Sequence, residues 1–416
     1  MPGPRKSIFD PVHGTILLDG PALALIGSEE FQRLWGIRQT GFAHLVFPGA
    51  NHTRLEHSLG TFWVAGQMAD RLGLEGRARR RVTAAALLHD LGHGPFSHTL
   101  DSPMMEVLGM SHEGISRARI EGTDPDWPAE RAEVPHLLER FGVRPREVAD
   151  LVDPLRGRSP SALERAILHG AVDADRIDYL QRDAHYTGVG HGAVDAGRLL
   201  ETIRADAGHV VFAEKGRSAV EGFLVGRALM YSTVYYHKTV RAAEMMAQAA
   251  VERQRGYPDV ARPQFRGTDG ELLDRLRSGD GLSRQLAQGL LARRLFKRAY
   301  GWRTVTGSAR AAWRRMVRRP PERRAMEDAI AAEIHASPGF VLIDLAALEP
   351  RTTVGDSWSN VRVFRDARPV FPFRAPGPWR SLAARPPSEW AVSVYVQPRA
   401  RASAARWLAR DSRILP

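Results

Sequence analysis

Cysteine is absent from this sequence of 416 residues, which excludes disulfide bonds and thiolate metal ligands. No apolar run approaches the roughly eighteen residues that a membrane-spanning helix needs. The first residues, MPGPRKSIFD, lack the apolar stretch of a secretory signal. These absences lead us to expect a soluble cytoplasmic protein with no membrane contact. They also restrict any metal site to His, Asp and Glu ligands.

Acidic residues are the minority among the charged ones, with 47 Asp and Glu against 59 Lys and Arg and a net charge of +12. Most of the positive charge is arginine, whose guanidinium group matches phosphate oxygens, so the composition suits a phosphate-bearing partner or nucleic acid. The alternative is arginine spread over solvated faces without a dedicated patch. Hydrophobic residues make up 43% of the chain, enough for one large domain and a smaller one.

Helical periodicity dominates the first two-thirds of the chain. Glycine and proline interrupt the opening segment, where an alternating stretch at 12–18 predicts a small hairpin. The stretch SPSALERAIL carries a capping box, with Ser161 before the apolar run and Glu164 three residues later. Apolar spacing predicts helices over 53–72, 81–88, 113–120, 134–141, 161–168, 175–184, 194–205 and 218–253.

The composition changes after residue 255. GYPDVARPQFRGTDG predicts a loop, GELLDRLRSGDGLSRQLAQGLLARRLFKRAY is helical again, and RRMVRRPPERR predicts a basic turn. Farther on, GFVLIDLAAL, NVRVFR and EWAVSVYVQP are typical of strands between Pro/Gly loops. We therefore predict a mainly α fold with a helical core over 1–255, a helical extension over 256–336 and a smaller α+β C-terminal domain over 337–416.

Residues with metal-binding chemistry concentrate in LLHDLGHGPFSH, which follows an apolar helix. His89 and Asp90 alone would fit a hydrogen-bonded pair at a helix end. Together with His57 in RLEHSLG and Asp175 in DADRIDYLQRD, they make a set of two His and two Asp on predicted helices, where a rigid backbone can aim ligands. Such a set suits one divalent ion among Mn²⁺, Mg²⁺, Fe²⁺, Co²⁺, Ni²⁺ and Zn²⁺. The ion would lower the pKa of a water molecule and polarise a phosphoryl group.

Four more titratable residues follow the candidate ligands: His93, His98, Asp101 and His112. A phosphoryl transfer that expels an alkoxide needs a general acid near neutrality, and histidine supplies one. Asp101 lies three residues after His98 and could hold its imidazole if that stretch is helical. Any one of these histidines alone is more often structural, but four His in residues 89–112 predict a site.

The ordered motifs RLEHSLG, LLHDLGHGPFSH and DADRIDYLQRDAHYTG resemble the HD-domain metal-dependent phosphohydrolases. With DPVHGTILL, EFQRLWGIRQTG, VFPGANHTRLEHSLG, SHEGIS and VYYHKTVRAAE, the chain looks like one branch of that family. This branch is the deoxynucleoside triphosphate triphosphohydrolases, which include the mammalian enzyme with SAM and HD domains and shorter bacterial relatives. The resemblance covers roughly residues 8–255, which would be the HD-type catalytic domain, and ELLDRLR and RRLFKRAY extend it more weakly.

The resemblance implies cleavage of dNTPs to deoxynucleoside and triphosphate, by attack of metal-held water on the α-phosphate. The metal ligands it implies are His57, His89, Asp90 and Asp175. The catalytic residues it implies are His98, which would protonate the leaving 5′ oxygen, the supporting Asp101 and His112, and His93 near the α-phosphate.

The resemblance also implies substrate contacts. For the phosphate chain these are Arg54, Arg227, Lys238 and Arg176, the last in place of a lysine that is frequent in the family. For the sugar they are Gln39 and Asp183 at the 3′-OH, and Tyr179 and Tyr235 at the 2′ position, where they would favour deoxyribose.

Three positions depart from the mammalian pattern. Trp35 replaces an arginine and Gly27 an acidic residue of the guanine activator site, so we do not expect that site here. Tyr231 replaces an active-site histidine, which changes the expected base pocket. The residues that could bind an effector triphosphate at a subunit interface are Arg198, Lys215 and Arg217. The family implies a homo-oligomer, a dimer or tetramer, and we expect no SAM domain before the catalytic part.

Two alternatives to a dNTP triphosphohydrolase stay open. One is a broader phosphohydrolase that acts on nucleoside monophosphates or other phosphate esters. The other is a basic nucleic-acid-binding protein, suggested by the net charge and RRMVRRPPERR, whose binding would depend steeply on salt. A nuclease would combine the two alternatives.

Overall fold

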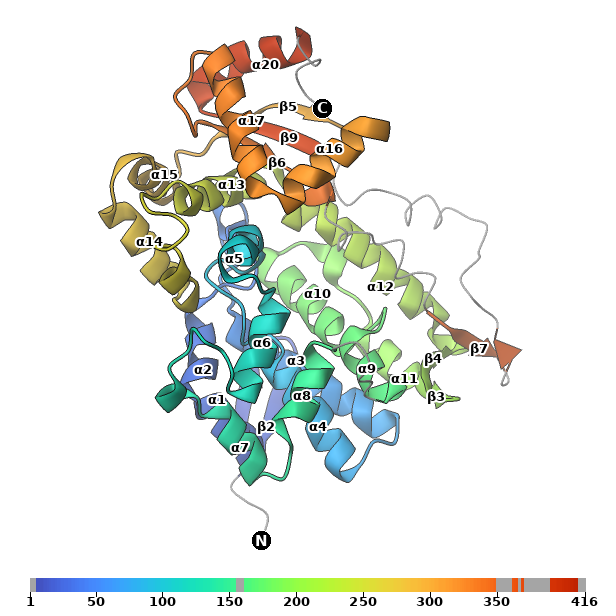
Figure 1. Cartoon of the computed structure of the whole chain (residues 1–416). Coiled ribbons are helices and arrows are strands. Elements are labelled where there is room, and N and C mark those ends of the chain that lie inside the picture. Colours follow the sequence, from blue (N-terminus) through green and yellow to red (C-terminus); the bar gives the residue numbers. More distant parts are fainter. Residues whose placement is uncertain (1–4, 155–160, 349–360, 366–367, 370–389, 411–416) are drawn as a thin grey trace.

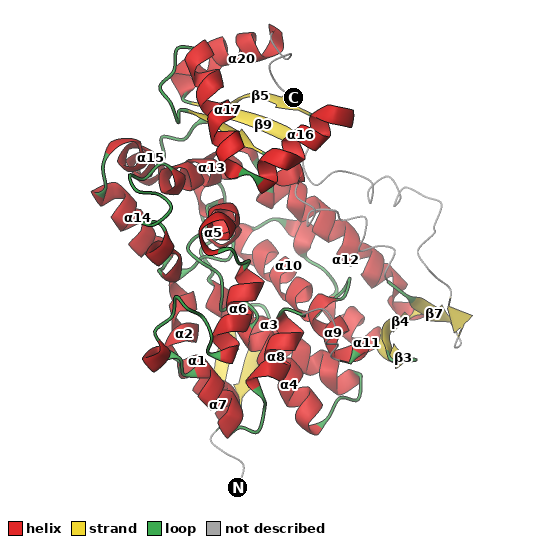
Figure 2. Ribbon diagram, viewed as in Figure 1, coloured by secondary structure: helices red, strands yellow, loops and turns green. Residues whose placement is uncertain are grey.

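The structure is a computed structural model that describes residues 5–154, 161–348, 361–365, 368–369 and 390–410. Helices dominate it and strands form three small sheets, so the fold is mainly α, as predicted (Figures 1 and 2). The first part of the chain contains the hairpin β1 (Lys6–Asp10) and β2 (Gly14–Leu18), followed by α1 (Gly20–Gly27), α2 (Glu29–Gln32), α3 (Arg54–Arg71), α4 (Gly76–Leu88), α5 (Asp101–Leu108), α6 (His112–Glu121), α7 (Val134–Arg140), α8 (Pro145–Val152), α9 (Ala162–His169) and α10 (Ala174–Thr187).

Helix α3 packs against both α4 and α10 (Figure 1). Two candidate metal ligands lie on α3 and α10, and the other two, His89 and Asp90, directly follow α4. Helix α3 begins with a capping box, because the Thr53 side chain accepts from the Glu56 backbone and the Glu56 side chain accepts from the Thr53 backbone. Its apolar side belongs to a core that includes Leu55, Val64 and Met68. The capping box predicted at Ser161 also forms and begins α9. The local signals therefore agree with the packing at both helix starts.

The middle of the chain continues with α11 (Ala196–Thr202), the hairpin β3 (Ile203–Asp206) and β4 (His209–Ala213), α12 (Arg217–Met230), α13 (Lys238–Glu252), α14 (Asp269–Ser278) and α15 (Gly281–Leu291). Helices α13, α14 and α15 share a second core with Phe42, Phe96 and Leu100. These three residues come from the part of the chain that surrounds the candidate site. The second core therefore connects residues beyond 255 to the loop that carries His98.

The C-terminal part comprises β5 (Lys297–Trp302), α16 (Gly307–Arg318), α17 (Pro320–Glu333), β6 (Val341–Asp344), β9 (Val392–Val396) and α20 (Arg401–Arg410). Strand β9 lies between β5 and β6 in an antiparallel sheet, and the helices cover it over a third core (Figure 1). The division predicted at residue 336 does not follow this sheet, since β5 comes before it. Strands β7 (Val363–Arg365) and β8 (Arg368–Pro369) instead join the β3–β4 hairpin, through parallel pairing of β4 with β7.

The prediction of one continuous helix over 218–253 was wrong. Helix α12 ends at Met230, a π-helical turn spans Tyr231–Tyr235, and α13 begins after His237, whose side chain accepts from the Thr239 backbone N–H. The wider turn interrupts the 3.6-residue period, which apolar spacing alone does not show. It places Tyr231 and Tyr235 on the wall of the cavities described below.

Three further predictions were wrong, two of them because strand pairing between distant segments overrides local periodicity. The helix predicted over 194–205 ends at Thr202, since the next residues pair with β4. The end of ARRLFKRAY is strand β5, not helix. RRMVRRPPERR is not a turn but the end of α16 and the beginning of α17, where Pro320 occupies a first-turn position that tolerates proline. The predicted hairpin exists, but 12–18 covers only its turn and second strand.

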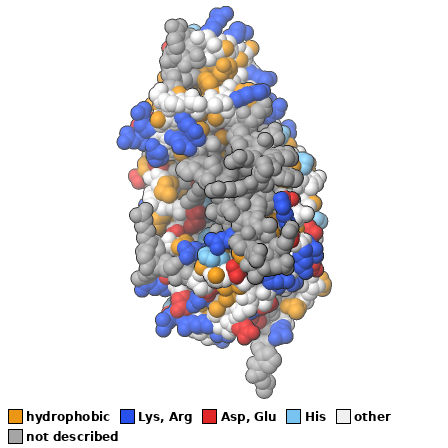
Figure 3. Space-filling model, turned by 90° about the vertical axis from the view of Figure 1, so that its right-hand side faces the viewer, with side chains coloured by type: hydrophobic (Ala, Val, Ile, Leu, Met, Phe, Trp, Pro, Cys, Tyr) orange, Lys and Arg blue, Asp and Glu red, His pale blue; other side chains and the backbone are white. Residues whose placement is uncertain are grey.

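Charge is dispersed over the described part of the face drawn in Figure 3. On the face drawn in Figure 3, Lys and Arg side chains occur at the top, at the sides and near the lower end, with acidic groups among them. Many arginines are also engaged in ion pairs, for example Arg315 and Arg319 with Glu322. Among the described helices, none has the length and apolar character that crossing a membrane requires.

Candidate metal and phosphate site

The four predicted metal ligands come together at the meeting point of α3, α4 and α10. The Nε2 atom of His57 lies 3.0 Å from Asp175 Oδ1 and 3.8 Å from Asp90 Oδ2. His89, at the C-terminal end of α4, has its Nε2 atom 3.2 Å from Asp90 Oδ1 and 3.9 Å from Asp175 Oδ1. Ligand atoms of His57, His89 and Asp90 lie within 4.8 Å of one another. Such spacing is compatible with a single shared ion.

The hydrogen bonds of His89 indicate which nitrogen would bind metal. Its Nδ1 lies 2.8 Å from the backbone oxygen of Ala86, so Nδ1 carries the proton and Nε2 keeps its lone pair. Nε2 is buried and has no hydrogen-bond partner among the described residues. A buried acceptor without a partner is costly, and a cation would satisfy it. The donor set therefore fits a divalent metal ion.

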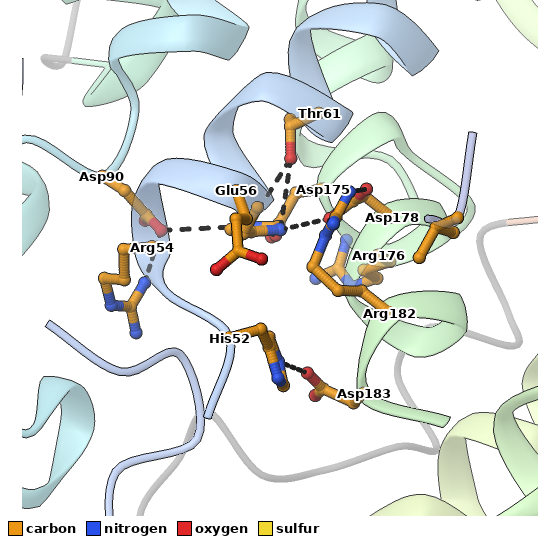
Figure 4. A network of polar contacts seen from close by, with 12 residues as sticks. His52, Arg54, Glu56, Thr61, Asp90, Asp175, Arg176, Asp178, Arg182 and Asp183 are labelled. Atoms are coloured by element: carbon orange, nitrogen blue, oxygen red, sulfur yellow. Dashed lines mark hydrogen bonds and ion pairs between the residues drawn. The ribbon is translucent and has the colours of Figure 1, made fainter. Parts of the chain in front are cut away.

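Asp178 holds the candidate metal ligand His57 through the ring nitrogen that faces away from Asp90 and Asp175. Its Oδ2 lies 2.7 Å from His57 Nδ1, and its Oδ1 lies 2.6 Å from the Nε2 of His13. Arg182 donates to both oxygens, from Nε at 2.9 Å and from Nη2 at 2.8 Å, and its Nη1 donates to Asp10 at 2.8 Å. Figure 4 shows Asp175, Asp178 and Arg182 projecting from α10 toward α3. This network orients the imidazole so that Nε2 faces Asp90 and Asp175.

The electrostatics of the ligand set favour a cation. Burial alone would lower the pKa of His57, but the carboxylates of Asp175 and Asp178 raise it to about 10. Burial would raise the pKa of Asp90, but the neighbouring Arg54 and His89 hold it well below its usual range. The carboxylates that would retain a proton on His57 offer the same negative charge to a metal ion.

Arg54, the first residue of α3, is buried between the metal ligands and the loop that follows α4. Its Nε donates to Ser97 Oγ at 2.7 Å, and its Nη1 donates to Asp90 Oδ2 (Figure 4). Its Nη2 is buried and has no hydrogen-bond partner among the described residues. Arg54 also lines the cavity over the metal ligands. A guanidinium donor without a partner there suits a phosphate oxygen.

The histidines of the second group meet around Asp101. Asp101 Oδ2 lies 3.0 Å from His98 Nδ1, and Oδ1 lies 3.2 Å from His112 Nδ1. The stretch is helical as required, with a short 3₁₀ turn at Ser97–Leu100 leading into α5 at Asp101. The His98 side chain is 65% exposed, so it can reach a ligand, whereas His93 is buried and stacks on His112 with a centroid distance of 3.9 Å.

The pKa directions separate the roles of these histidines. Burial lowers the pKa of His93 well below its ordinary value, and Arg54 adds to that effect, so this imidazole is neutral. Burial would also lower the pKa of His112, but the Asp101 carboxylate raises it overall. Burial would raise the pKa of Asp101, but His112 and His98 keep it well below its usual range, so this carboxylate is ionised and can orient both rings.

Two adjoining cavities contain most of the remaining predicted residues. The first, of about 280 Å³, lies over the candidate metal ligands, and its lining includes His89, Asp90, Asp175, Arg54, Arg176 and Arg227. The second, of about 390 Å³, extends toward α13, and its lining includes Gln39, Asp101, Asp183 and Tyr235. Seven residues line both cavities: Gln39, His98, His112, Glu113, Asp175, Tyr179 and Tyr231. A ligand could therefore extend from the metal ligands past His98 into the second cavity.

The predicted phosphate-binding residues differ in their surroundings. Arg227 is buried beneath Tyr231, with its guanidinium carbon 5.5 Å from the ring centroid. Arg176 lines the first cavity, but its Nη1 donates to Asp173 and to the backbone oxygen of Gly170. The structure does not bring Lys238 to either cavity, because this residue begins α13 with its side chain exposed.

The predicted sugar-binding residues line the second cavity. Asp183 is held by His52, whose Nε2 lies 2.7 Å from Oδ1, and by the hydroxyl of Tyr235, which donates to Oδ2. Tyr179 and Tyr235 meet edge to face with a centroid distance of 6.3 Å. The buried oxygens of Gln39, Thr40 and Thr99 have no hydrogen-bond partner among the described residues. This cavity therefore offers unused polar atoms to a ligand.

The predicted effector residues lie on the surface near one another. Arg198 Nε donates to the backbone oxygen of Lys215 at 3.1 Å, and Arg217 pairs with Glu221. Trp35 is 54% exposed, and Gly27 ends α1 on the surface. Whether the cluster Arg198, Lys215 and Arg217 binds an effector stays a prediction.

Sequence reasoning missed His13, His52, Asp178 and Arg182. Within DADRIDYLQRD, Asp178 follows Asp175 by three residues and precedes Arg182 by four, so all three share a helix face, and this signal could have identified them. His13 and His52 contact residues 165 and 131 positions away, and no local signal marks such pairs.

Comparison with protein families agrees with this geometry. A family described as "HD domain" matches residues 54–183, which contain all four candidate metal ligands. A second family, "HD associated region", matches residues 194–410, more than half of the chain. The chain belongs to the HD-domain family. It is thus an HD-domain protein with its associated region, and the HD match begins with α3 and ends within α10.

Individual relatives of this HD-domain protein fall into two groups. Uncharacterized proteins from Methanocaldococcus jannaschii and Bacillus subtilis are 41% and 37% identical over 60% and 61% of this chain. The human deoxynucleoside triphosphate triphosphohydrolase SAMHD1 is 33% identical over 44% of this chain and 34% of its own length. The matches to the first two cover 50% and 57% of those proteins, so the chain spans about half their length.

Solved structures match this HD-domain chain over nearly its whole length. A hypothetical protein from Aquifex aeolicus superposes with a TM-score of 0.72 at 25% identity, covering 97% of this chain and all of that one. A phosphohydrolase from Bacteroides thetaiotaomicron gives a TM-score of 0.72 at 24% identity over 94% of this chain, which shows a common fold. The family and the donor set together support a metal-dependent hydrolase.

Proposed function

We propose that this HD-domain protein cleaves deoxynucleoside triphosphates to a deoxynucleoside and triphosphate. The observation that carries the proposal is the continuity of the two cavities at His98 and Tyr179. His89, Asp90 and Arg54 line the first cavity alone, Asp183 and Tyr235 line the second alone, and Asp175 lines both. A bond between phosphate and sugar would then lie next to His98. The relation to deoxynucleoside triphosphate triphosphohydrolases supports this assignment.

His57, His89, Asp90 and Asp175 would hold a divalent metal ion, which when bound supplies a more acidic water and a polarised phosphoryl group. Arg54 would bind a phosphate oxygen through its buried Nη2 and keep Asp90 in place through Nη1. This arrangement neutralises charge that develops on the phosphoryl group during the reaction.

His98 would donate the proton that the leaving 5′ oxygen needs. Asp101 holds the Nδ1 atom of His98, so Nε2 is the atom left to deliver the proton. Asp101 also holds His112, and its carboxylate raises the pKa of that imidazole, which favours the protonated form. His93, neutral and buried, would pack behind these rings and orient them.

The second cavity would select the nucleoside. Asp183, fixed by His52 and Tyr235, and the amide of Gln39 would bind the 3′-OH. Tyr179 and Tyr235 would leave no room beside the 2′ carbon for a hydroxyl. The unused oxygens of Thr40 and Thr99 would accept or donate hydrogen bonds at the base edge.

Product analysis tests the proposal directly. Purified protein is incubated with Mn²⁺ and each dNTP, and the products are separated by anion exchange. We expect deoxynucleoside and triphosphate in equal amounts, and slower turnover of the matching ribonucleotide. Release of orthophosphate or pyrophosphate would contradict the proposed cleavage site.

One observation favours a second candidate, a broader phosphohydrolase for nucleoside monophosphates or other phosphate esters. Lys238 lies outside both cavities and Arg176 is bonded to Asp173, so fewer cations face the cavity than a triphosphate would use. In the same assay this candidate predicts turnover of deoxynucleoside monophosphates and little triphosphate product.

A further inference from the structure

The loop between α4 and α5 carries His93 and His98 and has an unfavourable backbone conformation. Phe96 has φ 56° and ψ 22°, and Ser97 has φ 55°, so two consecutive residues with side chains adopt the left-handed region. This conformation is costly for any residue other than glycine and persists only where neighbouring contacts enforce it. His98 follows directly, so its position depends on these contacts.

Asp269 supplies the contact that holds this turn, although it lies far beyond the HD match. Its Oδ1 accepts from the backbone N–H of Phe96 at 2.6 Å. Its Oδ2 accepts from the backbone N–H of Arg38 at 3.1 Å and lies 3.6 Å from the Arg38 guanidinium. Asp269 thus links Phe96, two residues before His98, to Arg38, the residue before Gln39.

The bonds made by Asp269 continue into the site. Ser97 Oγ donates to the backbone oxygen of Arg38 at 2.7 Å and accepts from Arg54 Nε at the same distance. Phe96 is buried and stacks on Phe42 with a centroid distance of 4.3 Å. A shift of Phe96 would therefore displace Ser97, and with it the contact to Arg54.

The position of Asp269 is fixed by its own surroundings. It is the first residue of α14, whose start is closed by a capping box between Thr268 and Glu271. Arg33 connects Gly267, two residues before Asp269, to the same loop, since it donates to the backbone oxygens of Gly267, Leu91 and His93. The start of α14 is thus attached to both ends of the loop.

Asp269 is 2% exposed, and burial raises its pKa to about 6 although the backbone N–H groups of Phe96 and Arg38 oppose the shift. At neutral pH the carboxylate is therefore ionised, and both oxygens are acceptors. An asparagine at this position would keep one acceptor and place an amide N–H against the second backbone N–H.

We propose that Asp269 is a positioning residue that holds the Phe96–Ser97 turn and thereby places His98 and Gln39 around the substrate. The HD associated region then has a defined part in the reaction, because it sets the conformation of the loop that carries the proton donor. The kinetic consequence rests on the proposed function, whereas the contact itself does not. A misplacement of a reacting group by about 1 Å can reduce the rate about a hundredfold.

Two variants and a control test this role. Asp269→Asn removes one acceptor, and Asp269→Glu keeps the charge but moves both oxygens by one methylene. The control is Asp274→Asn on the same helix, where the side chain is 68% exposed and pairs with Arg277 at 2.9 Å. Each full-length variant is compared with the parent by hydrogen exchange mass spectrometry, thermal unfolding and steady-state kinetics.

In both Asp269 variants we expect faster exchange confined to the two segments whose backbone N–H groups Asp269 accepts from, one around Phe96 (residues 94–100) and one around Arg38 (residues 37–40). The increase should be at least about tenfold, because a hydrogen bond to a charged group is lost. We expect kcat to fall about a hundredfold, with KM within about threefold of the parent. The control should match the parent. If Asp269→Asn does not fold, Asp269→Glu decides on the same readouts.

Unchanged exchange and kcat in the Asp269 variants would overturn the proposal. So would faster exchange throughout the protein, which indicates a general structural role. If the parent does not turn over dNTPs, the proposed function fails, but the exchange comparison needs no substrate and still decides whether Asp269 holds the turn.

Discussion

Asp178→Asn is the perturbation that best tests the support behind the metal ligands. The Asp178 carboxylate is fully buried and accepts from His13, His57 and Arg182. Asparagine has nearly the same shape but only one acceptor oxygen, so its amide N–H group must face a donor on one side. The substitution therefore breaks part of a buried ion pair without leaving a cavity.

The expected magnitudes follow from these contacts. Removing one partner of a buried ion pair costs about 3–5 kcal/mol, and we expect the lower end, because Arg182 keeps Asp10 at 2.8 Å. Loss of the group that orients a metal-binding histidine lowers metal affinity by about 10–100-fold. We therefore expect a loss of about 3 kcal/mol in the free energy of unfolding and at least about tenfold weaker metal binding.

Urea unfolding of the metal-free protein measures the first quantity, and calorimetric titration with Mn²⁺ well below the melting temperature measures the second. Asp70→Asn on α3 is a matched control, since its pair with Arg79 is on the surface, with 51% and 41% exposed side chains. Such a pair contributes about 0–1 kcal/mol. Metal affinity within about twofold of the parent in a folded Asp178→Asn variant would refute the orienting role of Asp178.

Four other predictions concern the proton donor, the metal, the phosphate contacts and pH. His98→Gln should lower kcat by about 10²–10⁴-fold, while the metal content measured by atomic emission spectroscopy should equal that of the parent. A kcat equal to that of the parent would exclude His98 as the general acid. Chelation with EDTA should abolish turnover, and added Mn²⁺ should restore it. In thermal unfolding of the metal-free protein, Mn²⁺ at about 100 times its Kd should add about 2.7 kcal/mol to the free energy of unfolding. A melting temperature that Mn²⁺ does not change would count against the metal site. Lys238→Ala should change KM less than about twofold, since the exposed side chain lines neither cavity, and a tenfold rise would return it to the phosphate site. Burial would raise the pKa of Glu106, but Arg324 and Tyr257 hold it below its ordinary 4.5. The ionised carboxylate therefore stabilises the fold above about pH 4.5, and this stabilisation is lost as the pH falls through the pKa of the folded state. The difference in unfolding free energy between the parent and Glu106→Gln should thus be full at about pH 7 and shrink below about pH 4.5, and a constant difference would contradict the pairing.

Sequence reasoning located the candidate site best where short motifs occur in the same order as in the HD-domain family. Three motifs separated by many residues predicted the candidate metal ligands, and the structure brings these residues together. Each lies on a helix or directly after one, and the apolar faces of these helices are also visible in the sequence. The mainly α fold was confirmed for the same reason. Helix starts with capping boxes, such as the one at Ser161, were located to within a residue.

The failures share one physical cause, which is that the deciding partner is distant in the chain. RRLFKRAY becomes strand β5 only because β9, nearly a hundred residues later, pairs with it. Asp269 shows no motif, since its importance depends on two backbone N–H groups elsewhere. The π-helical turn at Tyr231–Tyr235 likewise leaves no mark in apolar spacing.

The pairing of β4 with β7 has a consequence for synthesis on the ribosome. Val361 and Val363 belong to the same hydrophobic core as Ile16 in the first hairpin. Strand β7 pairs with the edge of β4, far from the C-terminal sheet (Figure 1). Roughly 150 residues must be made after β4 before that edge is covered, so the nascent chain exposes an open strand while the rest of its first core is already assembled. In a chain that ends at residue 336, β7 is missing and the edge of β4 would stay unpaired. Fragments that end there should therefore aggregate more readily than the full-length protein, even though every candidate metal ligand is present in them.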